Sequence, residues 1–284
     1  MWNRTLISDE SVRIRATREA AVLLFCTTFV RATFLSTLAI LALGAGSNAL
    51  SQVVSVTTYH NDNSRQGLND KESILTHANV NPNQFGKLFS RKTDGYSYAQ
   101  PLYLPGVNIP GLGVHNVVYV ATEHDTLYAF DADSNAGINR EPLWQRSFIN
   151  PVRGITTVAS QADAACADLV PEIGITGTPV IDTQTGTLYV VVRTKENGQF
   201  FQRLHALDVT TRAEKFGGPA VIRAKVKGTG DGAVNGFVHF DSLRNNQRAG
   251  LLLNRGGMSI GGSRYRSLTG PEANIPLIGA SFPS

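Results

Sequence analysis

The chain has 284 residues, of which 42% are hydrophobic and 17% charged, a balance that supplies a packed core and excludes long disorder. Five of the 26 basic and three of the 22 acidic residues fall within positions 1–51, so the remainder carries a net charge of only about +2. This remainder has no basic run and no basic stripe interleaved with aromatic residues. The sequence therefore carries no footprint of nucleic-acid binding.

Residues 1–51 have the order of a secretory signal peptide. Arginines precede the apolar run Thr33–Gly44, and small-residue cleavage sites follow near Ala49 and Ser51. The run of about 12 residues is shorter than the roughly 20 that span a bilayer. We therefore expect export to a periplasmic, extracellular or cell-surface location. An uncleaved signal anchor is the alternative, and it is the one predicted route to a membrane.

The segment after the leader begins with a polar loop rich in side chains that bind ions or ligands. His60, Asn61, Asp62, Asn63 and Arg65 are crowded into this loop. One interpretation is a ligand site on one face of the fold. The other is a hydrogen-bonded turn that anchors the first strand, because Asn and Asp side chains bond to nearby backbone groups, and we favour it.

Two later stretches repeat each other. Each has an x-Pro-apolar strand, a Val/Leu-Tyr-Val strand and a Leu-x-Ala-apolar-Asp strand, with a fourth strand available afterwards. The predicted strands are Ala99–Tyr103, Asn116–Ala121, Asp125–Asp131 and Pro142–Phe148 in the first copy, and Gly177–Ile181, Gly186–Val192, Arg203–Asp208 and Ala213–Phe216, continuing to Val221-Ile222, in the second. Four antiparallel strands per repeat are typical of a β-propeller blade. The sequence thus predicts an all-β fold, a partial propeller of about two to three blades over residues 52–254.

Three other stretches carry residues of chemical interest. Asp168 and Glu172 precede a glycine-rich strand start, and they are candidates for a ligand or metal loop, with a structural role for Glu172 favoured. The glycines of 228–232 lack the Lys-Ser/Thr of a phosphate loop, so a turn is expected there. The stretch 123–125, Glu-His-Asp, is expected to be a turn with no nucleophile nearby. Cys166, the one cysteine after the leader, is interpreted as a buried bystander.

The chain resembles the quinoprotein-like β-propeller family, which includes the pyrroloquinoline-quinone (PQQ) alcohol dehydrogenases and noncatalytic relatives. The likeness rests on Tyr59–Gly67, on the Asp-containing turns at Ala129–Asp133 and Ala206–Thr210, and on Leu143-Trp144, which is similar to the family's blade-docking tryptophan. The family's chemistry uses PQQ stacked between a tryptophan and a disulfide of adjacent cysteines, with a bound calcium ion. Since this chain has no adjacent cysteines, no residue is carried over as a quinone, calcium or catalytic ligand.

These observations favour a noncatalytic, exported propeller module that binds an unknown protein or glycan surface, with no cofactor. The alternatives are a PQQ-dependent, dehydrogenase-like oxidoreductase, with PQQ and calcium, and a gene fragment. Strand alternation stops after Asn254. The sequence therefore predicts an irregular tail over residues 255–284, which we interpret as a frameshift, a fragment or a divergent end.

Overall fold

The computed structural model describes residues 54–230, 232–254, 257–260, 263–264 and 278–280, with side chains in the first two of these ranges. All described residues belong to one unit, Ser51–Ser284. The predicted signal peptide therefore lies outside the described residues. Within the described part, no helix is long and apolar enough to span a membrane.

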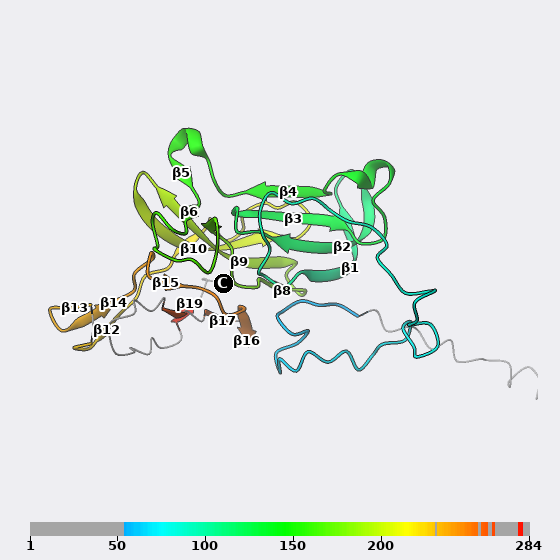
Figure 1. Ribbon diagram of the computed structural model, residues 1–284, viewed down its shortest axis with the longest axis horizontal. Helices are drawn as coiled ribbons and strands as arrows, with labels where there is room; N and C mark the ends of the chain where they lie inside the picture. The colour runs from blue at the N-terminus through cyan, green and yellow to red at the C-terminus, as the bar shows by residue number, and fades with distance from the viewer. Residues whose placement is uncertain (1–53, 231, 255–256, 261–262, 265–277, 281–284) are drawn as a thin grey trace, which may run out of the picture. The chain divides into compact units, whose positions relative to one another are not determined.

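The prediction of a β-rich chain built from small antiparallel sheets is confirmed for the described residues (Figure 1). Strands are joined by turns and by two short 3-10 helices, Gly137–Arg140 and Pro151–Arg153, and this part of the chain contains no α-helix. The strands are β1 (Leu102–Ile109), β2 (Gly113–Ala121), β3 (Thr126–Asp131), β4 (Trp144–Ser147), β5 (Ile155–Thr156), β6 (Val158–Ala159), β7 (Glu172–Ile173), β8 (Val180–Asp182), β9 (Thr187–Glu196), β10 (Gln199–Asp208), β11 (Ala220–Val221), β12 (Lys225–Lys227), β13 (Ala233–Val234), β14 (Phe237–His239), β15 (Asn245–Asn246), β16 (Leu252–Asn254), β17 (Gly257–Ile260), β18 (Ser263–Arg264) and β19 (Ile278–Ala280).

The first predicted repeat forms a four-stranded antiparallel sheet in the order β1-β2-β3-β4, called here the first meander. Val117, Tyr119 and Ala121 alternate along β2 and are all buried on one face. This period of two places every second side chain on the same side of a strand. The predicted strand at 116–121 forms the C-terminal part of β2, which begins three residues earlier, at Gly113.

The second repeat forms the second meander, β8-β9-β10-β11, to which β5 adds by pairing with the far end of β9. Strand β9 is apolar on both faces: Leu188 and Val190 face one hydrophobic cluster, and Tyr189 and Val191 face another. Continuous burial of this kind is expected of a strand in a sheet covered on both sides. The sequence did not predict β5, because two residues are too short to show a period.

The third strand of each meander ends in the same aspartate turn. The Oδ1 atoms of Asp131 and Asp208 each accept hydrogen bonds from the amides two and three residues further on, at 2.6 to 3.0 Å. An aspartate side chain that accepts hydrogen bonds from the following backbone amides in this way stabilises a turn. The repeated aspartates of the sequence therefore mark equivalent turns.

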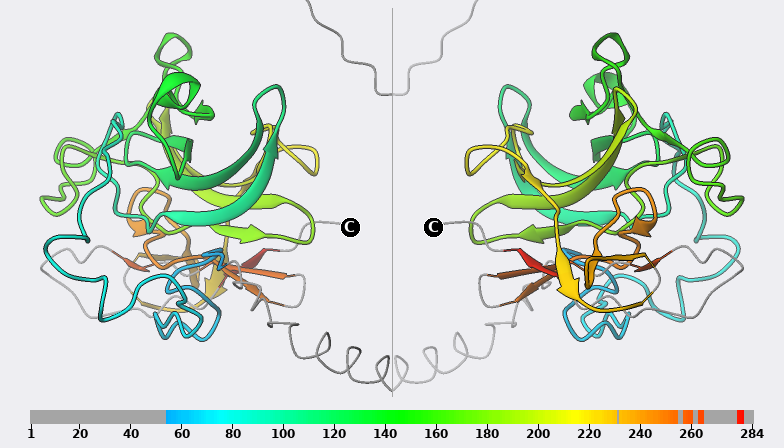
Figure 2. Two further views of the ribbon diagram at one scale, coloured as in Figure 1. Left: turned by 90° about the vertical axis from the view of Figure 1, so that its right-hand side faces the viewer. Right: turned by 90° about the vertical axis from the view of Figure 1, so that its left-hand side faces the viewer.

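The two meanders pack face to face on one apolar core (Figure 2). The first meander contributes Tyr119, Leu127 and Trp144, among others, and the second contributes Val190 and Leu207. Tyr119 and Trp144 also donate hydrogen bonds, from the hydroxyl and the indole N–H, to a single acceptor, the backbone carbonyl of Val209, each at 3.1 Å. These two donors fix the register of one sheet against the other, because a buried carbonyl needs its hydrogen bonds.

The opposite face of the second meander packs on the chain beyond β14. Leu251 is fully buried there, and Phe240 and Leu253 pack against the same cluster. The buried side chains of Arg193 and Gln202 reach backbone carbonyls at residues 242–245. Apolar contacts and buried polar side chains together attach this segment to the sheet.

Of residues 255–284, for which the sequence predicts an irregular tail, the structure describes the three short strands β17, β18 and β19, and the other positions lie outside the described residues. Strands β16, β17 and β19 form a three-stranded sheet, and β18 pairs with β15. These strands have two to four residues each. Such lengths are too short for an alternating pattern to stand out from the glycine-rich sequence around them.

Candidate functional site

Two buried acidic residues lie in the turn between β2 and β3. Glu123 and Asp125 belong to this turn, and their exposed fractions are 1% and 0%. The segment of residues 172–176, called here the latch segment, docks on the turn, where the Ile175 amide bonds to the Thr122 carbonyl at 3.3 Å. The site therefore joins the first meander to the chain that leads into β8.

The Glu123 carboxylate bonds to the latch segment through one oxygen. Its Oε2 accepts hydrogen bonds from the Gly174 amide at 2.7 Å and from the Thr176 hydroxyl at 3.1 Å. Its buried Oε1 has no hydrogen-bond partner among the described residues. Burial raises the pKa of Glu123 to about 7, and the nearby Glu172 charge adds to this rise, while these hydrogen bonds and Arg193 oppose it.

Asp125 is enclosed more completely. Burial and the neighbouring Glu123 raise the pKa of Asp125 well above its usual range, with the Arg193 amide and guanidinium as weaker opposing influences. Neither carboxyl oxygen makes a hydrogen bond of normal geometry with the described residues. Since burying an unpaired charge is costly, this environment favours the neutral form of the carboxyl. Its backbone φ of 53° places Asp125 in the left-handed region.

Gly174 allows the two carboxylic residues to approach the latch segment. A Cβ on this glycine would lie 2.7 Å from Asp125 Oδ1 and would also collide with the Glu123 carbonyl oxygen. Real Cβ atoms do not tolerate such contacts. The glycine is therefore required here for close approach.

His124, between the two acids, points to a different partner. Its Nδ1 lies 2.9 and 3.0 Å from the two carboxylate oxygens of Glu172, and the Thr157 hydroxyl donates to Glu172 Oε2 at 2.7 Å. This side chain is 37% exposed. A histidine oriented by a carboxylate is one part of an acid–base site, but among the described residues no hydroxyl or thiol bonds to the His124 ring. The pair thus orients an imidazole without a nucleophile.

The residues predicted as a ligand loop at 168–172 do not converge. Asp168 lies at the surface and pairs with Arg248 at 2.8 Å, whereas Glu172 is bound to His124 and Thr157. Cys166 is buried in a small cluster with Leu169 and other apolar side chains. In the part of the chain with described side chains, no three His, Cys, Asp or Glu residues are arranged to hold a metal ion.

The 60–65 loop is a compact turn that ties chain segments together. Asp62 Oδ1 accepts hydrogen bonds from the Ser64 amide and hydroxyl and from the Arg65 amide, and His60 Nδ1 lies 3.1 Å from the Arg65 carbonyl. Asn63 and Arg65 donate to the carbonyls of Leu253 and Leu251. Asn61 lies in the same turn at a φ of 72°. The side chains of His60, Asp62, Asn63 and Arg65 thus bond to groups of the chain itself.

The glycine-rich 228–232 stretch connects β12 to β13, and the Gly228 amide bonds to the Gly236 carbonyl at 3.0 Å. Position 231 lies outside the described residues. The neighbouring elements are β-strands, and a phosphate loop requires a following helix. The geometry is that of a connection between strands.

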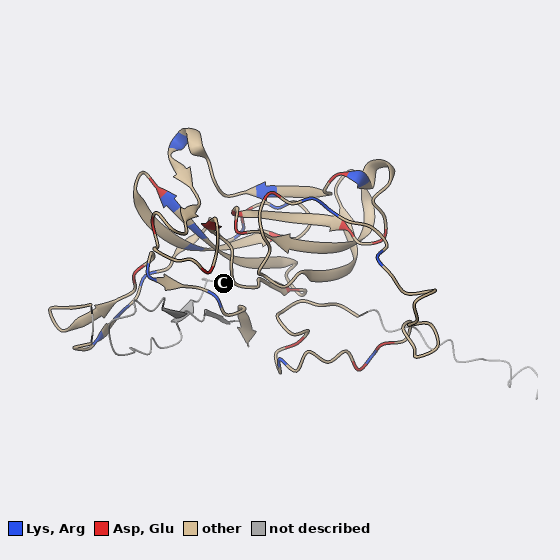
Figure 3. Ribbon diagram, viewed as in Figure 1, with Lys and Arg blue, Asp and Glu red and all other residues tan. Residues whose placement is uncertain are grey.

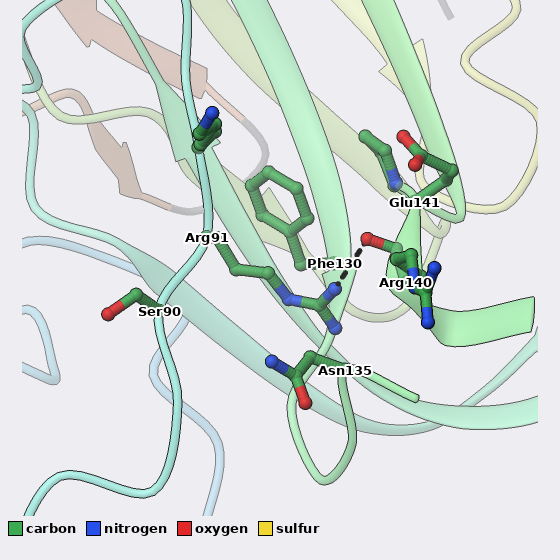
Figure 4. A pocket seen from close by; sticks show the side chains of 8 residues that line it. Ser90, Arg91, Phe130, Asn135, Arg140 and Glu141 are labelled. Atoms are coloured by element: carbon green, nitrogen blue, oxygen red, sulfur yellow. Dashed lines mark hydrogen bonds between the residues drawn. The ribbon is translucent and has the colours of Figure 1, made fainter. Parts of the chain in front are cut away.

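One surface pocket of about 280 Å³ lies beside the 3-10 helix at 137–140 (Figure 4). It is lined by Ser90, Arg91, Lys92, Phe130, Asn135, Arg140, Glu141 and Pro142. Its central cation, Arg91, donates to four backbone carbonyls, those of Asp131, Ser134, Asn139 and Arg140. Arg91 therefore serves to hold the 131–140 loop. Elsewhere, basic and acidic residues are interspersed over the described elements (Figure 3).

The quinone cofactor implied by the resemblance does not fit the described residues. Trp144 has an exposed fraction of 5% and is hydrogen-bonded into the second meander through Val209. Its ring contacts Tyr119 at a centroid distance of 5.7 Å. A tryptophan enclosed between two sheets offers no open face for stacking on a planar cofactor, so no reaction step is derived through PQQ.

Comparisons of the chain with known protein families, with curated proteins and with solved structures found no match. The sequence correctly predicts a turn at residues 123–125. It does not predict that the carboxyl groups of this turn are buried. The signal available in the sequence was two acidic residues placed directly after an apolar strand. That signal alone does not separate a solvated turn from an enclosed one, because the covering segment lies about 50 residues further along the chain.

Proposed function

We propose that the chain is an exported, noncatalytic binding or scaffold module built from quinoprotein-like propeller blades. The supporting observation is the way the two meanders stack. The face of the first meander that carries Tyr119 covers the second, and the equivalent face of the second, with Tyr189, is covered by the next part of the chain. Repeats that stack in one direction form a rigid scaffold that presents loops.

Two exposed tyrosines define the surface that we assign to partner binding. Tyr96 and Tyr98 are 63% and 48% exposed. The backbone beneath them is fixed: the Tyr96 carbonyl accepts the Glu123 amide at 2.8 Å, and Ala99 is buried. Rigid aromatic side chains on a firm support bind protein and glycan surfaces at low entropic cost. The partner is therefore a macromolecular surface, with a polysaccharide as the form tested first.

The test uses the mature protein, residues 52–284, in pull-down assays with insoluble chitin, cellulose and peptidoglycan. We expect saturable retention on at least one polymer, and a loss of about tenfold or more in affinity for the Tyr96→Ala/Tyr98→Ala double variant. The matched control is Ile138→Ala/Val152→Ala, which removes two other exposed apolar side chains, 72% and 98% exposed. Equal losses in both variants would contradict the assigned surface.

A second measurement addresses the activity itself. The protein is incubated with PQQ and calcium and assayed for quinone absorbance and for dye-linked alcohol oxidation. We expect neither retained quinone nor turnover, because Trp144 is enclosed. Saturable quinone binding with turnover would overturn the noncatalytic proposal in favour of an oxidoreductase.

A further inference from the structure

We propose that Glu123 is a proton-dependent latch between the first meander and the latch segment, closed when its carboxyl is protonated and weakened when it ionises. The geometry places the Glu123 carboxyl inside an interface between two parts of the chain that are about 50 residues apart. One oxygen bonds to the latch segment through Gly174 and Thr176. The other oxygen is buried without a partner among the described residues.

The surroundings of Glu123 disfavour a negative charge. Asp125, from the same turn, and Glu172, from β7, are acids that face it. Arg193, from β9, is the opposing cation, and it also bonds to Asn246 and to the Leu243 carbonyl. Its charge lowers the pKa of Glu123 by less than burial raises it, so it compensates an ionised Glu123 only in part.

Two further ionisable groups lie around the same turn. Asp94 accepts hydrogen bonds from the hydroxyls of Thr122 and Thr126, at 2.9 and 2.6 Å. His124 is directed at Glu172. Asp94 is itself an acid and His124 is engaged with Glu172, so neither neutralises an ionised Glu123. A buried carboxylate with one unpaired oxygen and acidic neighbours is costly.

The sign of the effect follows from proton linkage. The folded carboxyl has a pKa of about 7 and a free Glu has an ordinary pKa of about 4.5, so the closed interface holds a proton that the open one releases. The bound proton stabilises the closed interface fully below about pH 4.5, and this stabilisation is lost as the pH rises to about 7. The opening constant should therefore increase about tenfold per pH unit across this window and level off above it.

Amide hydrogen exchange at Gly174 and Ile175 measures the opening, between pH 5 and pH 8. The reference is Glu123→Gln, which keeps an oxygen acceptor for Gly174 and carries no titrating proton. We expect the wild-type opening constant, divided by that of this variant, to rise by about 40-fold from pH 5 to pH 7. A ratio that stays flat would overturn the proposal. Thermal unfolding at the same pH values supplies a second readout if local exchange is too fast.

Two control variants separate the latch from its neighbours. Thr176→Val removes a hydrogen bond to Glu123 without removing an ionisable group, so it should raise opening while the pH dependence persists. His124→Asn should likewise keep the pH dependence. If the dependence disappears in His124→Asn and persists in Glu123→Gln, the histidine is the titrating group and the proposal fails.

A cation is the alternative ligand for these buried oxygens. Calcium chloride is added at pH 8 and compared with sodium chloride at equal ionic strength. We expect no difference in exchange or in melting temperature. Stabilisation by calcium that is present in the wild type and lost in Glu123→Gln would show that the carboxyls bind a metal instead of a proton. The measurements do not require a bound partner, so their outcome is independent of the proposed binding function.

Discussion

At the scale of single residues, the notable feature is the density of buried acids around one glycine. Glu123 and Asp125 leave three carboxyl oxygens without partners of normal geometry among the described residues. Their enclosure depends on Gly174, whose missing side chain makes room for Asp125 Oδ1. Native proteins keep few unsatisfied buried polar groups, and those that persist are commonly sites of strain or function.

Replacing Gly174 by alanine tests this close approach. We expect Gly174→Ala to destabilise the protein by about 1–3 kcal/mol, because the added Cβ collides with backbone and carboxyl atoms. Urea unfolding monitored by tryptophan fluorescence measures the change. The matched control is Gly86→Ala, since a Cβ there has no neighbour within 4 Å and the change should stay within about 0.5 kcal/mol. Similar values for both variants would contradict the tight contact.

At the scale of elements, two strands of the first meander bond to the second meander through one backbone carbonyl, that of Val209. Tyr119 on β2 and Trp144 at the start of β4 both donate to Val209, which follows β10. Losing one donor leaves the carbonyl satisfied, while losing both leaves it buried and unpaired. The cost of an unsatisfied buried group, about 1–3 kcal/mol, exceeds the net value of one hydrogen bond.

A double-mutant cycle tests this shared acceptor. We expect Tyr119→Phe to cost about 0.5–1.5 kcal/mol and Trp144→Phe somewhat more, because the smaller ring also leaves a cavity. The double variant should be less stable than the sum of the single changes by at least about 0.5 kcal/mol. Equilibrium unfolding monitored by far-ultraviolet circular dichroism gives all four stabilities. Strict additivity would show that Val209 does not couple the two donors.

At the scale of the whole molecule, two sets of carboxyls act in opposite directions with pH. In Asp131 and Asp208, burial raises the pKa, but hydrogen bonds outweigh it and the net pKa is lowered: from His115 and backbone amides for Asp131, and from Thr210 and Thr211 for Asp208. Their stabilisation is present above the usual aspartate pKa and is lost as the pH falls. Glu123 has a raised pKa, so its contribution is lost as the pH rises to about 7.

These opposite pH dependences together predict that the free energy of unfolding is greatest at about pH 5. Melting temperatures measured from pH 3 to pH 9 should fall on both sides of this value. Glu123→Gln should flatten the decline between pH 5 and pH 7 and leave the acid limb unchanged. Asp208→Asn should reduce the acid limb and leave the other side unchanged. A maximum above pH 7 in the wild type would contradict this assignment.

The sequence alone determined the longer strands of the two repeats, but not short strands such as β5. The alternation around Tyr119, the apolar run around Tyr189 and the aspartates at 131 and 208 predicted strands and turns that the structure contains. These features are visible in sequence because they depend on local periodicity and on side chains bonding to the adjacent backbone. Trp144 was also identified as a docking residue, and its indole does bond to the second meander.

Only the tertiary structure decided which polar residues are enclosed. Asp168 and Glu172 are four positions apart, yet one lies at the surface and the other binds His124. Glu123 and Asp125 occupy a turn that would be solvated in isolation and become buried when the latch segment covers them. Burial depends on contacts between residues far apart in the chain, and these contacts leave no local pattern. The raised pKa values of the two acids arise from that burial, so they are a property of the folded protein.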